Sequence, residues 1–431
     1  MNGLLHLPPW LDQEAATLAG AIPPADTFAE SLPAFTRAVS LTPLQRLQLV
    51  QEAGITEYGY SGEPVHLAWR RFLRGQGDSV LVIDATMHDQ HSLGTAAILD
   101  KAPWLLAEGV LIAIGLRNSQ KIELLLPSVL NGHEAPFLNA VDAIRSMAGI
   151  STPGREIEVV RNSMPGCWSE GHPPDRDRLV HTPETWCRIA LLFAGTPDIN
   201  GSLLTLRQGF GERGLTEIAR SANLRKQVEE WRGGPETNGN DPVIVFDDSM
   251  GGFLPLTRAD VLCDPLSLLS VGVVPSPSSL TVIADGTCIV KQTRRAMYRH
   301  WLLADGKETH VRTLLARAAR LVTEVTLGTG SMSHLAALEE VSAELTARGL
   351  AASYPLGSSL RYFRQQWENH ARNETCPENL CLVRNAAPCH GTCPANIDIP
   401  SFMALLGKGD HHSTIEVIRQ DNPFPLTCGL V

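Results

Sequence analysis

The stretch "SVLVIDA", residues 79–85, decides the fold of the first half of the chain. It is a continuous apolar run of strand length, which is typical of a strand buried on both faces of a parallel sheet. The pattern of the following residues predicts a helix at 102–116, a strand at 121–127, a helix at 135–149 and a strand at 155–161. Strands that alternate with helices predict a doubly wound α/β layer.

The pattern of apolar residues changes twice after this α/β layer. Short apolar runs separated by Gly and Pro turns predict a small α+β module between about 196 and 288, and apolar residues at helical spacing predict helices from 307 onward. We therefore expect five parts: an irregular N-terminal arm (1–40), an α/β domain (41–195), an α+β domain (196–288), a helical bundle (289–372) and a helical, cysteine-rich tail (373–431).

Composition sets limits on the class of protein. The chain has 431 residues, 43% of them hydrophobic, which is enough to build several cores. Its net charge of -10 argues against nucleic-acid binding, because proteins that follow a phosphate backbone concentrate Lys and Arg. No run reaches the roughly 18 apolar residues of a membrane span, and the N-terminus lacks a basic segment. We expect a cytoplasmic protein without a membrane span.

The nine cysteines are unevenly distributed. Cys376, Cys381, Cys389 and Cys393 crowd one short segment, "CPENLCLVRNAAPCHGTC", and this crowding favours a metal site over disulfides. Thiolates in such a segment suit an iron–sulfur cluster or a zinc ion, and thiols without metal are the third interpretation. The scattered cysteines at 167, 187, 263 and 288 are predicted to be buried structural thiols.

The segments "EAGITEYGYSGEPVHLAW" (52–69), "VLVIDATMHDQHSLGTAAILDKAPWLLAEGVLIA" (80–113) and "LVHTPETWCRIALLFAG" (179–195) carry a resemblance. Over about 40–372 the chain resembles the NADH-binding flavin subunit of respiratory complex I and its soluble hydrogenase and formate dehydrogenase relatives. The resemblance implies a Rossmann-like domain with a parallel sheet, a β-grasp domain beginning near "GSLLTLRQGF" (201–210), and a helical bundle.

The same resemblance implies a flavin site that has degenerated. Gly59, Gly62, Trp69 and Asp84 stand at positions of the family's flavin site. Tyr and Glu side chains now neighbour the glycines, and only a bare Gly backbone lets N–H groups approach a phosphate closely. The cysteines that start the family's bundle are also absent from "YRHWLLADGKETHVRT" (298–313). We therefore expect neither an intact FMN or NADH site nor a cluster in the bundle.

The tail is similar to a second family. "PCHGTCPANIDIP" and "NPFPLTCG" fall in the order seen in the N-terminal iron–sulfur domain of the glutamate synthase small subunit and of dihydropyrimidine dehydrogenase, over about 385–431. The resemblance implies a 4Fe-4S cluster on Cys376, Cys381, Cys389 and Cys393, with zinc as the alternative. Only the early cysteine group of that family is present, which suggests a truncated tail or one completed by a partner chain.

These resemblances imply a non-catalytic or electron-relay subunit of an NAD(P)H-linked oxidoreductase complex. The expected partners are other oxidoreductase subunits, in particular a glutamate-synthase-like flavoprotein or an iron–sulfur subunit. No catalytic residue is assigned. Two alternatives remain. One is an active flavin-dependent NAD(P)H oxidoreductase, in which Trp69, Tyr58 and Tyr60 stack on the flavin. The other is a small-molecule-binding module that uses the emptied cleft and the β-grasp domain.

Overall fold

The structure is a computed structural model. It describes the following parts of the chain: residues 32–58, 62–86, 92–117, 119, 121–147, 156–161, 176–195, 201–208, 213–234, 241–304, 309–381, 393, 395, 397–407, 409–422 and 425.

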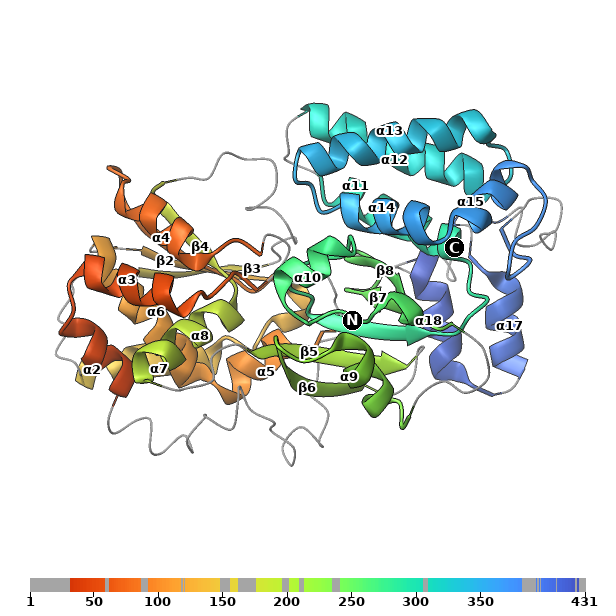
Figure 1. The fold of residues 1–431 in the computed structure, drawn as a ribbon. Coiled ribbons are helices and arrows are strands. Elements are labelled where there is room, and N and C mark those ends of the chain that lie inside the picture. Colours follow the sequence, from red (N-terminus) through yellow and green to blue (C-terminus); the bar gives the residue numbers. More distant parts are fainter. Residues whose placement is uncertain are drawn as a thin grey trace.

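The first domain is built on a parallel four-stranded sheet, seen beside the helices that flank it in Figure 1. Its strands are β1 (Val80–Asp84), β2 (Lys121–Leu126), β3 (Glu156–Arg161) and β4 (Arg178–His181), in the order β3-β2-β1-β4. All three pairings are parallel, and the central residues of β1 are fully buried. The predicted α/β layer is confirmed. The strand order reverses between β1 and β4, and ligands of open α/β sheets bind outside the carboxyl ends of the strands at such a point.

Seven helices belong to this domain in the described part of the chain: α2 (Pro33–Val39), α3 (Pro43–Ala53), α4 (Val65–Leu73), α5 (Gly94–Lys101), α6 (Pro103–Arg117), α7 (Ala135–Met147) and α8 (Pro183–Ala194). Gly109 lets α6 approach α8 closely, because a Cβ there would lie 2.0 Å from the carbonyl oxygen of Trp186. Gly54 ends α3 in the left-handed conformation at φ 66°, which a residue without Cβ adopts at little cost.

The N-terminal arm differs from the prediction at its last residues. Residues 33–39 form α2, whose Ala34 and Ala38 are fully buried and which packs against α6 and α8. The sequence did not reveal this helix because it is short and its apolar residues are small, so that tertiary packing stabilises it rather than its own periodicity.

The second domain is a β-grasp fold. Its strands are β5 (Gly201–Gln208), β6 (Arg213–Ala219), β7 (Val243–Phe246), β8 (Gly252–Pro255) and β9 (Ser279–Ile283), with helices α9 (Leu224–Trp231) and α10 (Pro265–Ser270). The sheet order is β6-β5-β9-β7-β8. The central pair β5–β9 is parallel and the other three pairs are antiparallel, which confirms the expected β-grasp module.

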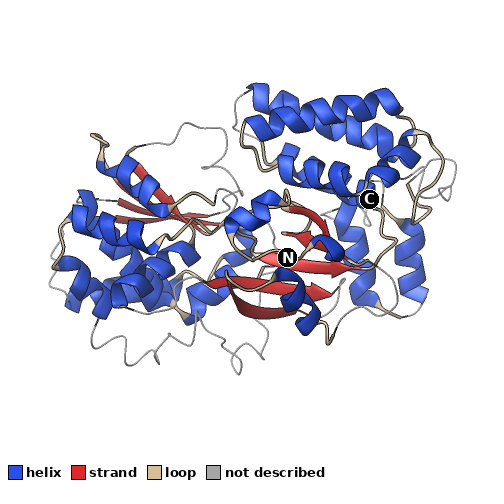
Figure 2. Ribbon diagram, viewed as in Figure 1, coloured by secondary structure: helices blue, strands red, loops and turns tan. Residues whose placement is uncertain are grey.

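The bundle and the tail are helical, as Figure 2 shows. The bundle contains α11 (Ile289–Leu302), α12 (Thr309–Thr326), α13 (Met332–Ala347), α14 (Ser353–Tyr362) and α15 (Arg364–Ala371), and the tail contains α17 (Ile399–Gly407) and α18 (His411–Asp421). The predicted bundle and the two short tail helices are confirmed. No helix in the described residues is long and apolar enough to cross a membrane.

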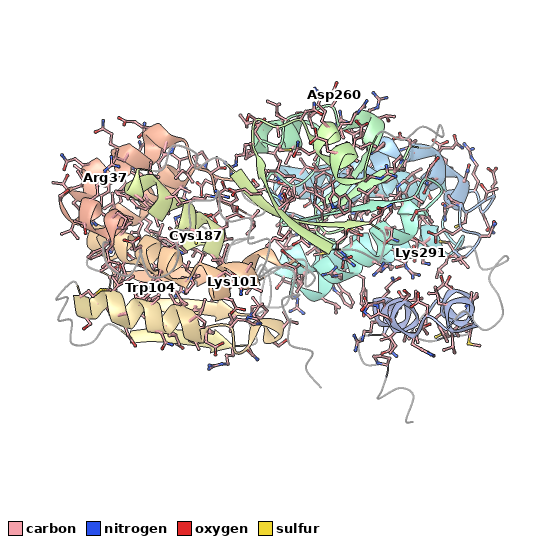
Figure 3. The ribbon with its side chains drawn as sticks, turned by 90° about the horizontal axis from the view of Figure 1, so that it is seen from below. Arg37, Lys101, Trp104, Cys187, Asp260 and Lys291 are labelled. Carbon is pink, nitrogen blue, oxygen red and sulfur yellow. The ribbon has the colours of Figure 1, made fainter. Side chains whose placement is uncertain are left out.

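A buried ion pair joins the tail to the bundle. Lys291 of α11 lies toward α17 and α18, as seen from below in Figure 3. Its ammonium group is 3.1 Å from a carboxylate oxygen of Asp398 and 3.5 Å from one of Glu378. Asp398 also accepts a hydrogen bond from the backbone N–H of Ser401 at the start of α17. Arg294 of the same helix lies 4.0 Å from a carboxylate oxygen of Asp421 in α18. Cations of α11 therefore bind acidic residues of the tail.

Candidate functional site

Four potential metal ligands converge where the bundle meets the tail. Cys288 precedes α11 as its N-cap, and its sulfur accepts the backbone N–H of Lys291 at 3.4 Å. Its own N–H donates to Glu378 at 3.0 Å. The helix N-terminus presents positive partial charge to the Cys288 sulfur, which favours a thiolate, whereas burial of the side chain opposes it.

His370 lies on α15 and turns one ring nitrogen toward Cys288. Its Nδ1 is 2.7 Å from the carbonyl oxygen of Gln366, and its Nε2 is 3.5 Å from the Cys288 sulfur. A carbonyl only accepts, so Nδ1 carries the hydrogen and the lone pair of Nε2 faces the sulfur. Histidine ligands of metals are commonly oriented by such a hydrogen bond from the other nitrogen.

Cys376 and Cys381 complete the group. The four ligand atoms all lie within 4.8 Å of one another, and all four residues are buried. The sulfurs of Cys288 and Cys381 are 3.5 Å apart. Tetrahedral zinc with bonds of about 2.3 Å to sulfur and about 2.0 Å to nitrogen separates its ligands by about 3.5–3.8 Å. In a 4Fe-4S cluster each ligand binds a different iron, so the ligand atoms stand further apart. The donor set therefore fits a single tetrahedral ion.

The thiols of this group differ in acidity. Hydrogen bonds from Cys288 and Cys381 hold the pKa of the Cys376 thiol far below its ordinary value, whereas burial raises the pKa of the Cys288 thiol well above its own. A metal ion would displace the remaining protons, as thiolates rather than thiols are the ligands.

The structure thus brings together two of the four cysteines that the sequence singled out. Cys376 and Cys381 belong to the group, whereas Cys393 is half-buried and is not one of its members. Cys389 lies outside the described residues. Cys288 is buried, as predicted for it, but it lies beside the tail cysteines rather than alone.

His370 was not considered as a ligand from the sequence. Its spacing to the tail cysteines, His-x5-Cys-x4-Cys, is a local signal that could have found it. Nothing local marks Cys288, which precedes His370 by 82 positions.

A second polar group fills the carboxyl edge of β1 and β4. Trp69 is fully buried, and its indole N–H donates to Nε2 of His181 at 3.2 Å. An indole nitrogen only donates, so His181 carries its hydrogen on Nδ1. That hydrogen is donated to a carboxylate oxygen of Glu57. Both ring nitrogens of His181 are therefore occupied within the protein.

The Glu57 carboxylate lies at the N-terminus of α8. Its Oε1 accepts the N–H of Thr182 at 2.9 Å, the hydroxyl of Thr182 at 3.1 Å and the hydroxyl of Thr185 at 2.8 Å. Thr182 is the N-cap of α8. The free N–H groups and the dipole of a helix N-terminus favour a negative charge here.

Asp84 adds a second carboxyl group to this edge. It ends β1 and accepts the N–H of Thr86 at 3.0 Å. Burial, and to a smaller extent the nearby negative charge of Glu57, raise the pKa of Asp84 to about 6, against the hydrogen bonds from Thr86. The edge therefore contains a second carboxyl group, and the charge of Glu57 disfavours the ionisation of Asp84.

Of the residues expected in the degenerate flavin site, Trp69 and Asp84 lie at this edge. Gly62 has φ 55°, and a Cβ on it would lie 2.9 Å from the side chain of Pro275 in the β-grasp domain. Gly59 lies outside the described residues. The sequence did not single out Glu57 and His181, because no spacing in the chain relates a loop residue to the end of a distant strand.

Comparison with known proteins agrees with both resemblances. Residues 362–431 match a family model described as dihydropyrimidine dehydrogenase domain II, 4Fe-4S cluster. The NADH-quinone oxidoreductase F 2 protein of Rhizobium meliloti (strain 1021), a subunit of that enzyme, is 23% identical over 383 residues, which are 78% of this chain and 91% of that protein. The HndC component of the NADP-reducing hydrogenase of Solidesulfovibrio fructosivorans is 21% identical over 393 residues, 80% of each chain.

The fold has a similar counterpart among solved structures. A chain of an NAD+-reducing NiFe-hydrogenase in the H2-reduced state superposes with a TM-score of 0.64 at 18% identity, covering 91% of this chain and 71% of that one. The chain is therefore a homologue of the F-type subunits of NADH-quinone oxidoreductases and of HndC, and its C-terminal segment matches the 4Fe-4S domain of dihydropyrimidine dehydrogenase.

Proposed function

We propose that this chain is a non-catalytic, electron-relay subunit of an NAD(P)H-linked oxidoreductase complex and that it holds neither flavin nor NADH at the edge of its parallel sheet. One observation carries the proposal: the carboxyl edge of β1 and β4 is filled by the chain's own side chains. Its homologues are subunits, which supports a role within an assembly.

The side chains at this edge bind one another and leave few groups with which a flavin could interact. Trp69 is fully buried and His181 is 2% exposed, and they bind each other rather than facing a cleft. The donors at the N-terminus of α8 are engaged by Glu57. A flavin phosphate placed there would meet Glu57 and Asp84, whose negative charges oppose it.

We propose further that Cys288, His370, Cys376 and Cys381 hold one zinc ion. Structural zinc sites are closed, with four protein ligands and no position left for water, and three thiolates with one imidazole form such a set. The ion would bind α11, α15 and the first residues of the tail to one another. Zinc does not change its oxidation state, so the electron-carrying centre is a separate one.

The iron–sulfur cluster of the tail then depends on other cysteines. With Cys376 and Cys381 committed to zinc, Cys389, Cys393 and Cys428 are left in the tail. A 4Fe-4S cluster takes four thiolates. We propose that a partner protein completes the cluster, and a glutamate-synthase-like flavoprotein or an iron–sulfur subunit is the class of partner that the tail suits.

The test is an analysis of zinc, iron, acid-labile sulfide and flavin in the full chain purified without oxygen. We expect one zinc per chain, no flavin and substoichiometric iron. The variant Cys288→Ser should lose the zinc, and Cys187→Ser, which removes a buried thiol of the α/β domain, should keep it.

Three outcomes would each overturn a different part of the proposal. Stoichiometric flavin would restore the enzyme interpretation. About four irons per chain that disappear in Cys288→Ser would place a cluster rather than zinc on this group. About four irons that disappear only in Cys393→Ser would mean that the tail closes its cluster without a partner.

A further inference from the structure

We infer that the metal group of the bundle controls the docking of the tail, and that Glu378 and Lys291 transmit this coupling. The inference rests on the proposed zinc ion and adds a regulatory role to it. A chain that holds the ion presents α17 and α18 in one position, whereas a chain without it holds them loosely. The cysteines proposed for a shared cluster lie in the same tail, so the ion also sets whether a partner protein meets them in a defined position.

Helices α17 and α18 have little apolar attachment to the rest of the chain. No residue of α17, all of which the structure describes, is buried, although its sequence "IPSFMALLG" is largely apolar. In α18 only Thr414 and Val417 are buried. Burial of apolar surface is the dominant favourable contribution to folding and association. The tail therefore depends on polar contacts for its position.

Lys291 of α11 makes the shorter of two ionic contacts with the tail helices (Figure 3). Its ammonium group lies 3.1 Å from Asp398, which precedes α17 and accepts the backbone N–H of Ser401. The contact of Arg294 with Asp421 at the end of α18 is 4.0 Å long. The orientation of Lys291 therefore determines how firmly the start of α17 is held.

The proposed metal group orients Lys291 at both ends of the residue. Its backbone N–H donates to the sulfur of Cys288 at 3.4 Å. Its ammonium group lies 3.5 Å from Oε2 of Glu378, whose Oε1 accepts the backbone N–H of Cys288 at 3.0 Å. An ion on the Cys288 sulfur fixes the start of α11 and thereby both of these contacts. Glu378 is not a ligand but a positioning residue.

Glu378 lies in a loop that the ion would close. It stands between Cys376 and Cys381, which are both members of the metal group. Within this loop Asn379 is in the left-handed conformation at φ 56°, and its backbone N–H donates to the carbonyl of Cys376 at 3.0 Å. The free energy of binding at a closed metal site stabilises the segments that supply its ligands. Loss of the ion therefore frees the loop and the carboxylate that orients Lys291.

The bundle itself has contacts that do not need the ion. Gln366 of α15 accepts the backbone N–H of Ile289 at 2.8 Å and donates to the carbonyl of Thr287 at 3.3 Å, which joins α15 to the start of α11. Helices α12 and α13 contribute a large apolar core, which includes Leu315 and Leu338. Removal of the ion should therefore release the loop and the tail while the bundle stays folded.

The test compares the zinc-loaded full chain with the same chain after a chelator has removed the zinc, and the readout is hydrogen exchange followed by mass spectrometry. Removal should raise the exchange rate of peptides from 376–381 and from α17 by about tenfold or more, because local opening replaces a docked state. Peptides from α12 and β2 should not change. Zinc added back should restore the slow exchange.

Glu378→Gln tests the coupling without removing a ligand. The amide oxygen can still accept from the backbone N–H of Cys288, but the charge that orients Lys291 is gone. Exchange in α17 should rise several-fold while one zinc per chain is retained. The matched control is Glu374→Gln, which changes an exposed carboxylate of the same segment and should behave as wild type.

Linkage supplies a second readout. If the ion stabilises the docked tail, the docked tail must stabilise the bound ion by the same factor. Asp398→Asn removes the charge before α17 but keeps a good N-cap residue there. Although Asp398 is not a ligand, this variant should bind zinc several-fold more weakly in competition with a chelator, and by no more than the factor by which zinc slows exchange in α17.

The outcomes separate this inference from the proposed zinc site. Zinc in wild type, with exchange of α17 unchanged after chelation, would overturn the coupling and leave the zinc site standing. Equal acceleration of α12 would overturn it too, because the ion would then stabilise the whole bundle. Unchanged exchange in Glu378→Gln, or unchanged zinc affinity in Asp398→Asn, would refute the proposed transmission. Wild type without zinc would overturn the zinc site and this inference together.

Discussion

Because α6 contains a buried carboxyl group, we predict that the α/β domain loses stability as the pH rises toward neutrality. Glu108 is fully buried, and its Oε1 accepts the backbone N–H of Phe35 in α2 at 3.1 Å. Its other oxygen is buried without a hydrogen-bond partner in the described structure. Burial raises the pKa of Glu108 from 4.5 to about 7, against the hydrogen bonds from the backbone of α2.

The sign and the size of this pH dependence follow from the ordinary pKa of Glu108, 4.5, and its raised pKa of about 7 in the folded state. Between pH 4.5 and about 7 the folded state keeps a proton that the unfolded state releases, so the free energy of unfolding falls as the pH rises and levels off above about 7. A pKa difference of about 2.5 corresponds to about 3 kcal/mol, because each pKa unit is worth about 1.4 kcal/mol. In Glu108→Gln the amide oxygen can still accept from Phe35, while the ionisation is gone.

The assay is urea unfolding at a series of pH values. Hydrogen exchange of peptides from α6 is the readout, so that the other domains do not contribute to the signal. Glu108→Gln should match wild type near pH 4.5 and exceed it by about 3 kcal/mol at pH 7.5. The matched control is Glu52→Gln on the exposed side of α3, which should follow the wild-type profile. Parallel pH profiles for wild type and Glu108→Gln would refute the reasoning.

Three further predictions concern the metal group, the helix contact and the tail. His370→Ala should lower zinc from one per chain to near zero in elemental analysis, and unchanged zinc would exclude His370 as a ligand. Gly109→Ala places a Cβ 2.0 Å from a carbonyl oxygen of α8 and should cost about 3 kcal/mol in urea unfolding, whereas Gly407→Ala meets no atom within 4 Å and should change little. Lys291→Met leaves Asp398 without its buried cation and should cost about 3 kcal/mol locally, seen as faster proteolysis of the tail, and an unchanged rate would contradict the role of the ion pair.

Local sequence patterns predicted much of the fold. The apolar run at 80–83 lies in β1, whose central residues are buried, and Gly54 ends α3 as a glycine in the left-handed conformation does. The short helix 33–39 was missed, since its stability comes from packing against α6 and α8. Its two small buried residues make no helical stripe that a sequence pattern could reveal.

The sequence by itself determined the order of domains and the crowding of thiols in the tail, because strand and helix periodicities and cysteine spacing are local properties of the chain. Only the tertiary structure decided which groups meet. Cys288 joins Cys376 because the bundle folds α11 back beside the start of the tail. His181 lies beside the end of β1 because β1 and β4 pair in parallel, and Glu57 reaches it from the loop between α3 and α4. Such contacts between distant residues depend on how the elements pack, which no local spacing records.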